Sequence, residues 1–221
     1  MNTYDTVLFD LDGTLTESGE GIIKSVQYAL EQFGIVEADT ERLREFVGPP
    51  LVGSFQKFYR FDQEQAKQAL AYYRERFSTI GIFENALYPG VKEMLDALYG
   101  KGVHLALASS KPEKYVLQIL EHFQIASYFS VVTGSTMDDK RTKKVDMIEE
   151  TLKRLGKETE REKVLMVGDT EHDVIGAKEA GIDCAAVTYG YGTLEEIEME
   201  EPVLIAGSVE ELKHELLNYC E

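Results

Sequence analysis

Cysteine and long apolar runs are scarce in this sequence, which argues against a disulfide framework and a membrane-spanning segment. The 221 residues include two cysteines, Cys184 in an expected core strand and Cys220 near the C-terminal end. This placement is typical of reduced thiols in a cytoplasmic protein. No apolar run approaches the roughly 18 residues that a membrane-spanning helix requires. The first residues show no basic segment followed by an apolar one, so we expect no secretory signal.

Positive charge is the other scarce feature. Lysine and arginine together number 23, against 40 aspartates and glutamates, which gives a formal net charge of −17. Because binding to a nucleic-acid backbone requires basic patches, we expect no nucleic-acid partner. Screening over about 8–10 Å would soften the repulsion of an anionic substrate, but the site that binds it must still supply local positive charge.

The residues from Val7 to Leu15 place two carboxylates at the end of an apolar segment. Val7-Leu8-Phe9 is typical of a short strand buried on both faces of a parallel sheet. Ligands bind at the carboxyl ends of such strands, and Asp10 and Asp12 would point the same way while the strand lasts. Two acids this close favour a metal ion or widely separated pKa values. The alternative is a β-turn at Asp12-Gly13.

Hydrophobic periodicity divides the chain into two kinds of structure. Residues 16–86 carry apolar side chains at helical spacing, with Thr40 as an expected N-cap and Asp62 to Gln65 as an expected capping box. The rest alternates between strands and helices, the pattern of βαβ units. We therefore predict an α/β fold: a doubly wound parallel sheet formed by residues 1–15 and 87–221, with an all-helical domain, residues 16–86, inserted after the first strand.

The later elements can also be placed. Apolar runs predict strands at residues 103–108, 129–133, 164–167, 184–188 and 203–205. A helix is expected after each of the first two, and another that opens with a capping box from Ser208 to Glu211 ends the fold. The acidic run from Glu195 to Glu201 is expected to be a solvated face or a loop.

Polar residues stand where the strand at residues 103–108 ends and where the helix after the strand at residues 129–133 begins. Ser109 can donate to phosphate oxygens together with backbone N–H groups of the next turn, or cap the helix near Pro112. Lys143 and Lys144 lie at a helix start, where the macrodipole disfavours a cation, and this favours a lysine that belongs to a site. The alternative is two solvated lysines.

A further carboxylate follows the strand 164–167. Gly168 allows close backbone approach there, and Asp169 can point toward the same crevice as Asp10. Asp173 is expected to orient the loop or a metal-bound water. His172 is expected to be a surface or hydrogen-bonding residue and not a ligand.

Asp10-Leu11-Asp12-Gly13-Thr14-Leu15 resembles the first motif of the haloacid dehalogenase superfamily, most of whose members are phosphatases. Ser109, Lys144 and Gly168-Asp169 follow in the order of the later motifs of that superfamily. The resemblance covers the whole chain, and residues 16–86 resemble the type-one helical cap of its phosphoglycolate phosphatase-like and 5′-nucleotidase-like branch. Glu17 departs from the pattern, because Asp is usual at this position.

The resemblance implies a chemistry for each motif. Asp10 would attack phosphorus to form an aspartyl-phosphate, and Asp12 would serve as acid and then as base. Asp10, Asp169 and Asp12, the last through its backbone carbonyl, would hold Mg²⁺, which takes octahedral oxygen ligands. The substrate-binding residues implied or expected are Gly13, Thr14, Ser109, Ser110, Lys144 and Pro49.

We expect a small phosphorylated metabolite as the partner, with phosphoglycolate and a nucleoside 5′-monophosphate both fitting. The protein is expected to be a cytoplasmic monomer or homodimer that binds no membrane. Arg74, Lys111 and Arg141 are candidates for recognition of the leaving group, or are solvated charges or packing turns.

Three other activities are weighed against this one. A β-phosphoglucomutase-like isomerase would use the same core, but the loop from Gly48 to Leu51 resembles the phosphatase branch. A phosphonate hydrolase would need a cap lysine that forms a Schiff base, and Lys57 and Lys67 sit in no matching motif. A non-catalytic binding module would not need the acidic and basic residues of all the motifs.

Overall fold

The computed structural model describes residues 3–137 and 143–220, so Arg141 lies outside the described residues. The chain divides into two compact units, one made of residues 1–16 with 87–221 and the other of residues 17–86. No helix in the described part is both long and apolar enough to cross a bilayer.

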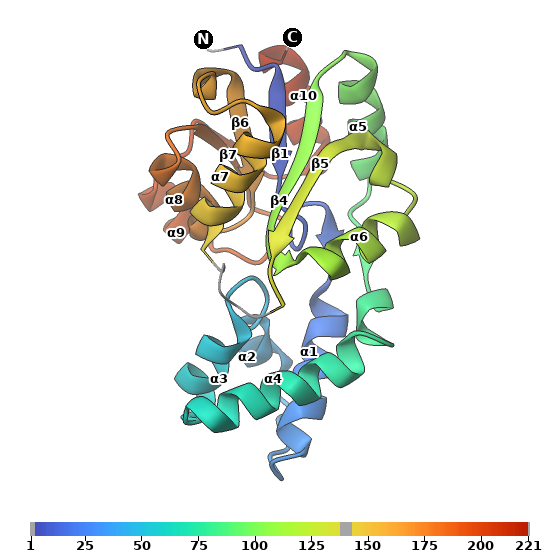
Figure 1. The fold of residues 1–221 in the computed structure, drawn as a ribbon, viewed down its shortest axis with the longest axis vertical. Coiled ribbons are helices and arrows are strands. Elements are labelled where there is room, and N and C mark those ends of the chain that lie inside the picture. Colours follow the sequence, from blue (N-terminus) through green and yellow to red (C-terminus); the bar gives the residue numbers. More distant parts are fainter. Residues whose placement is uncertain (1–2, 138–142, 221) are drawn as a thin grey trace. The chain divides into compact units, whose positions relative to one another are not determined.

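A six-stranded sheet forms the centre of the larger unit, with the strand order β5-β4-β1-β6-β7-β8 (Figure 1). All neighbouring strands are parallel. The sheet grows from β1 through β4 to β5 and then returns to the other side of β1, so the order reverses between β1 and β6. The strands are β1 (Thr6–Phe9), β4 (His104–Pro112), β5 (Phe129–Ser135), β6 (Val164–Gly168), β7 (Asp183–Val187) and β8 (Leu204–Ala206).

Helices cover both faces of this sheet. Figure 1 shows α7, α8 and α9 on one side and α5 and α6 on the other, and α10 packs against α5. This arrangement is the doubly wound α/β fold predicted from the sequence. The helices of this unit are α5 (Val91–Gly100), α6 (Glu113–His122), α7 (Lys144–Leu155), α8 (Glu171–Glu179), α9 (Leu194–Met199) and α10 (Val209–Tyr219), with 3₁₀ turns η2 (Ala126–Tyr128) and η3 (Arg161–Lys163).

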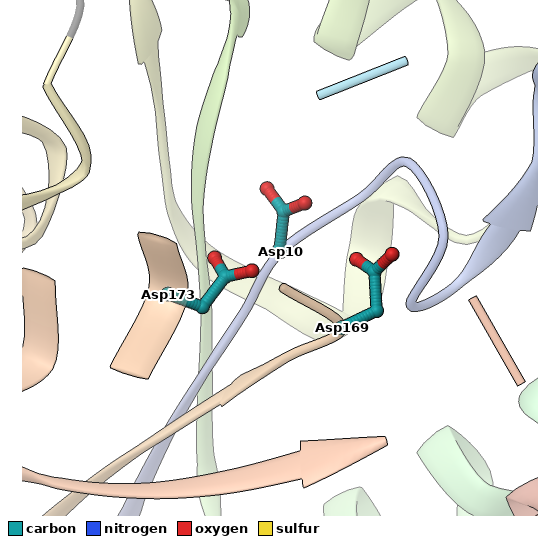
Figure 2. A group of neighbouring side chains, drawn as sticks. All are labelled: Asp10, Asp169 and Asp173. Carbon is teal, nitrogen blue, oxygen red and sulfur yellow. The ribbon is translucent and has the colours of Figure 1, made fainter. Parts of the chain in front are cut away.

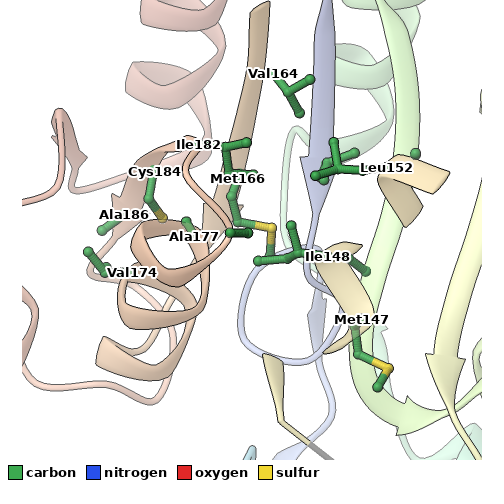
Figure 3. Packing of buried hydrophobic residues seen from close by; sticks show 14 of the residues in the cluster. Met147, Ile148, Leu152, Val164, Met166, Val174, Ala177, Ile182, Cys184 and Ala186 are labelled. Carbon is green, nitrogen blue, oxygen red and sulfur yellow. The ribbon is translucent and has the colours of Figure 1, made fainter. Parts of the chain in front are cut away.

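A cluster of buried apolar residues fills the core between the sheet and helices α7 and α8. Side chains at alternate strand positions point to this face, and they meet Met147, Ile148 and Leu152 of α7 (Figure 3). Burying this surface is the main stabilising term for the sheet and for the strand ends that carry the acids. The strand side chains in this cluster are Leu8, Ala106, Ala108, Val164, Met166, Cys184 and Ala186.

The smaller unit is helical and has its own aromatic core. Phe46 packs against Phe55 and Phe55 against Phe61, with ring centroids 5.1 and 6.0 Å apart. Its elements are α1 (Gly19–Glu31), α2 (Thr40–Arg44), α3 (Leu51–Tyr59), α4 (Gln63–Phe77) and the 3₁₀ turn η1 (Gly81–Phe83). The short strands β2 (Thr16–Glu17) and β3 (Ala86–Leu87) pair where the chain passes from one unit to the other.

Local capping chemistry was predicted partly correctly. The Asp62–Gln65 capping box is present in both directions. The N-cap of α2 is Asp39 and not Thr40, because the Asp39 carboxylate accepts from the N–H groups of Glu41 and Arg42. At α10, Ser208 accepts from the Glu211 N–H, but the Glu211 side chain accepts from Gly207 instead of Ser208.

The acidic run from Glu195 to Glu201 is where the expectation of a loop was wrong. Residues Leu194–Met199 form helix α9, capped by Thr193, whose hydroxyl accepts from the Glu196 N–H. Ile197 is fully buried in the core cluster, whereas Glu195, Glu196 and Glu198 are exposed. One apolar anchor on the sheet therefore stabilises a helix whose other faces are solvated, as the solvated-face alternative expected.

Leu152→Ala should test the core between α7 and the sheet. Leu152 is fully buried, so truncation leaves a cavity, and we expect the free energy of unfolding to fall by about 2–5 kcal/mol. Urea denaturation monitored by circular dichroism gives this value. Lys153→Ala, at the next and exposed position of the same helix, is the matched control and should change stability by less than about 0.5 kcal/mol. Equal effects of the two substitutions would contradict this account of the core.

Candidate active site

Two carboxylates lie at the carboxyl ends of adjacent strands, where the strand order of the sheet reverses. Phe9 of β1 pairs with Val167 of β6, and the Asp10 N–H donates to the Val167 carbonyl at 2.9 Å. Asp169 follows the last residue of β6. The switch point of an open α/β sheet is where ligands bind, so both side chains reach the edge at which chemistry is expected.

A third carboxylate joins them from helix α8. Asp10, Asp169 and Asp173 each bring one carboxylate oxygen to within 4.8 Å of the others, and all three residues are buried. Figure 2 shows the three carboxylates gathered together from the ends of β1 and β6 and the start of α8. We call these residues the carboxylate trio. Clustered carboxylate oxygens are the ligands that Mg²⁺ takes in proteins.

Asp169 is held in place from several directions. Thr14 Oγ1 donates to Asp169 Oδ1 at 3.1 Å, and the Tyr191 N–H donates to Oδ2 at 2.8 Å. A Cβ atom built on Gly13 would lie 2.0 Å from Asp169 Oδ2, and one built on Gly190 would lie 2.3 Å from it. Glycine is required at position 13 for a second reason, because its φ of +84° is in the left-handed region.

Lys144 is the first residue of α7 and points into the trio. Its Nζ lies 2.7 Å from Asp10 Oδ1, 2.7 Å from Asp173 Oδ1 and 3.2 Å from the Ala108 carbonyl. Gly176 leaves room for this side chain, since a Cβ there would lie 2.7 Å from Lys144 Cγ. Lys144 is buried and Lys143 is exposed, so the alternative of a solvated surface lysine holds only for Lys143.

Asp173 has a structural task besides its place in the trio. It caps α8, where its Oδ2 accepts from the N–H of Thr170 at 3.1 Å and from its hydroxyl at 2.9 Å. A carboxylate in the first turn of a helix is also favoured by the macrodipole. His172, its neighbour, is about half exposed and lies beside Glu171.

Negative charge in the trio exceeds the positive charge beside it. Burial raises the pKa of Asp10 to about 6; Lys144 opposes this rise and Asp173 adds to it. Burial, followed by Asp173 and Asp10, raises the pKa of Asp169 well above its usual value. Burial lowers the pKa of Lys144, but Asp10 and Asp173 outweigh it and the net shift is upward. One ammonium faces three carboxylates, so a divalent cation fits the charge and the donor atoms of this site.

Asp12 turns to a different partner. Its Oδ2 lies 2.6 Å from Lys111 Nζ, while its Oδ1 is buried and has no hydrogen-bond partner among residues 3–137 and 143–220. Its carboxylate is therefore not part of the trio, and the expected contribution to a metal site is the backbone carbonyl alone. The side chain of Lys111, near the end of β4, is 7% exposed, so the alternative of a solvated charge is wrong for this residue.

The remaining predicted residues are placed as follows. Ser109 lies within β4, nearly fully buried, and its Oγ accepts from the Lys111 N–H at 3.3 Å. It is not the N-cap of α6, because Pro112 holds that position. Ser110 is partly buried. Pro49 lies between α2 and α3 of the helical unit, and Arg74 lies in α4.

The comparisons with known proteins agree with this geometry. The model of the family described as haloacid dehalogenase-like hydrolase matches residues 7–187. The chain belongs to this family. The family resemblance inferred from the sequence is thereby confirmed.

Relatives of this haloacid dehalogenase-like hydrolase carry several names. A 5′-nucleotidase from Pseudomonas aeruginosa is 43% identical over 199 residues, which cover 90% of this chain and 89% of that protein. Phosphoglycolate phosphatase 1 from the same organism is 33% identical over 215 residues, covering 93% and 77%. Tyrosine-protein kinase PtkA of Mycobacterium tuberculosis is 37% identical over 212 residues, covering 95% and 72%. The crystal structure of a predicted phosphatase from Clostridium acetobutylicum matches with a TM-score of 0.93 and 44% identity, covering 98% of this chain and 99% of that chain.

Sequence reasoning missed the segment after β7 in this haloacid dehalogenase-like hydrolase. Tyr189 donates from its hydroxyl to the Thr14 carbonyl at 2.9 Å, and the next residues supply Gly190 and the Tyr191 N–H that hold Asp169. The signal was present, because two glycines alternate with two tyrosines directly after a core strand. Glycine at such a place indicates close backbone approach.

Gly190→Ala should disturb the packing around the Asp169 side chain. The new Cβ would lie 2.3 Å from Asp169 Oδ2 and 2.5 Å from the Gly13 carbonyl, so backbone must shift, and we expect a loss of about 1–3 kcal/mol in the free energy of unfolding. Urea denaturation measures it. Gly100→Ala is the matched control, because a Cβ there meets nothing within 4 Å at the end of α5, and it should be neutral or slightly stabilising. A Gly190→Ala protein as stable as the control would refute the close packing described.

Proposed function

We propose that this protein is a Mg²⁺-dependent phosphatase that hydrolyses a small phosphate monoester through an aspartyl-phosphate on Asp10. The observation that carries the proposal is the carboxylate trio at the switch point of the sheet, with Lys144 at 2.7 Å from Asp10 and from Asp173. Membership of a hydrolase family and relatives named as phosphatases support it.

Asp10 is the proposed nucleophile. Lys144 binds its Oδ1 and so fixes the carboxylate, which leaves Oδ2 for attack on phosphorus. Asp12, two residues further, is the proposed acid and base: it protonates the leaving oxygen and then takes a proton from the attacking water. Ser109, Ser110, Gly13, Thr14 and Pro49 remain the proposed substrate contacts, of which all but Pro49 belong to the larger unit.

Mg²⁺ would be held by Asp10, Asp169 and the Asp12 backbone carbonyl, with Asp173 orienting Lys144 and the loop before α8. When bound, it would neutralise charge on the phosphoryl oxygens, which is the main task in phosphoryl transfer. Lys144 supplies part of the same neutralisation as a point charge. Mg²⁺ and Lys144 together would supply the local positive charge that an anionic substrate needs, although the chain has a net charge of −17.

The names of the relatives support an order in which substrate classes should be tested. Nucleoside 5′-monophosphates are the first class to test, because the relative named 5′-nucleotidase shares more identity with this chain than the relative named phosphoglycolate phosphatase. Phosphoglycolate is the second.

We further propose a cytoplasmic location, with which the free and buried Cys184 and Cys220 agree, and a protein that needs no nucleic acid or membrane.

A panel of phosphate monoesters tests the function directly. Release of inorganic phosphate from nucleoside 5′-monophosphates, phosphoglycolate and hexose phosphates is measured colorimetrically, and hexose phosphates are also analysed for isomerisation. We expect release of phosphate and no isomerisation. Conversion of a hexose 1-phosphate to its 6-phosphate would favour the mutase, and a protein inactive on the whole panel would remove the phosphatase proposal.

Asp10→Asn should abolish turnover and leave the fold intact. An amide is not a nucleophile for phosphorus, so we expect phosphate release to fall by more than about 10³-fold. The amide oxygen can still accept from Lys144, so the melting temperature should hold. Asp5→Asn is the matched control: it removes a carboxylate just before β1, at the end opposite to Asp10, and should keep its activity. Near wild-type release by a well-folded Asp10→Asn protein would refute the nucleophile assignment.

Mg²⁺ should stabilise the chelator-treated protein. A ligand present at about 100 times its dissociation constant adds about 2.7 kcal/mol to stability, so the melting temperature should rise with MgCl₂ and not with KCl of equal ionic strength. Asp169→Asn should weaken the response, whereas Glu195→Gln, at an exposed position of α9, should retain it. A metal response that survives the loss of Asp169 would place the ion elsewhere.

A further inference from the structure

Lys111 has a nearly buried side chain to which the proposed mechanism assigns no role. It lies near the end of β4, just before α6, and its side chain is 7% exposed. Its Nζ lies 2.6 Å from Oδ2 of Asp12, whose side chain is 10% exposed. Removing an ammonium and a carboxylate from water is costly, so a buried pair of this kind is weak evidence for a stabilising role. The pair therefore calls for an explanation in terms of what Asp12 does.

The two oxygens of Asp12 are in different states. Oδ2 accepts from Lys111, whereas Oδ1 is buried and has no hydrogen-bond partner in the described part of the chain. A buried carboxylate oxygen without a partner is unfavourable, so its position in the site calls for an explanation. The backbone of Asp12 is fixed as well, through its parallel bridge with Thr16. Oδ1 is thus presented in one orientation.

We propose that Lys111 is a positioning residue for Asp12: it occupies Oδ2 and thereby directs Oδ1 to the oxygen atom that exchanges a proton. The inference rests on the proposed phosphatase function. Lys144 has the corresponding place on the nucleophile, since it contacts Asp10 and Asp173. Lys144 therefore positions the nucleophile Asp10, and Lys111 positions Asp12, the acid and base.

Both proton transfers pass through Oδ1. In the first step Asp10 forms a bond to phosphorus, the bond from phosphorus to the ester oxygen breaks, and the proton on Asp12 Oδ1 moves to that oxygen to give an alcohol. In the second step water bonds to phosphorus and gives a proton to Asp12 Oδ1, while the bond from Asp10 to phosphorus breaks and inorganic phosphate leaves. Asp12 thus returns to its starting state, and Lys111 takes no part in either proton transfer.

The leaving group separates this role from direct binding of phosphate. An alkyl phosphate needs a proton on its departing oxygen, whereas p-nitrophenyl phosphate loses a stable phenolate without one. A lysine that acts through Asp12 matters more for the alkyl ester in the first step. A lysine that only binds the phosphoryl group, or only stabilises the fold, affects both esters alike.

Lys111→Met, which keeps the length and loses the charge, is the test variant. We expect kcat/KM for an alkyl phosphate accepted by the wild type to fall about 100-fold, and kcat/KM for p-nitrophenyl phosphate to fall less than about tenfold. With p-nitrophenyl phosphate we also expect a burst of about one nitrophenolate per enzyme followed by slow turnover, because the water step then lacks a well-placed base. Lys111→Arg should recover part of the loss, since it keeps a cation for Oδ2.

Two controls complete the experiment. Lys157→Met removes another partly buried lysine of the same unit, which pairs with Asp5 at 2.9 Å, and should leave both kcat/KM values unchanged. In the Asp12→Asn background, Lys111→Met should cause no further loss, because the residue it positions is gone. This double variant carries no unpaired buried charge, so it guards against a single variant that fails to fold.

Equal losses for the two esters, no burst, or additive effects with Asp12→Asn would overturn the role of Lys111. Each of these results would leave the phosphatase proposal standing, because the wild-type protein would still hydrolyse the esters. A wild-type protein that hydrolyses neither ester would overturn both proposals together. The two failures are therefore distinguishable in one set of measurements.

Discussion

Ionised carboxylates repel one another, and this protein buries three of them within 4.8 Å at one edge of its sheet. Such a cluster persists only where cations and hydrogen-bond donors offset the repulsion and the loss of hydration. Lys144 supplies one positive charge against three carboxylates, and burial, together with the neighbouring carboxylates, raises the pKa values of Asp10 and Asp169. The rest of the site can be understood as a frame that keeps these groups together against their electrostatics.

That frame is the parallel sheet together with the loops and helices that leave its strands. β1 and β6 are neighbours, so Asp10 and Asp169 emerge side by side, and the apolar packing of α7 and α8 on the sheet places Lys144 and Asp173 against them. The backbone closes the site from the other side, where Gly13 and Gly190 come so close to Asp169 that neither tolerates a Cβ. The geometry of the site therefore depends on the stability of the core, because the helices α7 and α8 that pack on the sheet also carry Lys144 and Asp173.

Much of this was predictable from local patterns. The apolar run before Asp10 and the alternation of strands and helices indicated the fold, and the rule that parallel strands end at one edge grouped Asp10 with Asp169. Prediction failed where the local sequence signal was weak, or where two neighbouring residues were equally good candidates for one role. Glu195 to Glu201 has the composition of a loop, yet a single buried residue, Ile197, anchors a helix there. Thr40 and Asp39 are both good N-caps, and only backbone geometry selects Asp39.

The sequence by itself determined the α/β class, the helical insert pattern and the identity of the acids at the strand ends, since these depend on residues near one another in the chain. Tertiary structure alone decided which charges meet. Lys111 and Asp12 are 99 residues apart in the chain, and Lys144 and Asp10 are 134 apart, yet each pair is in contact. No periodicity encodes such a meeting, because it depends on strand order, and strand order is settled by how the helices bury the two faces of the sheet.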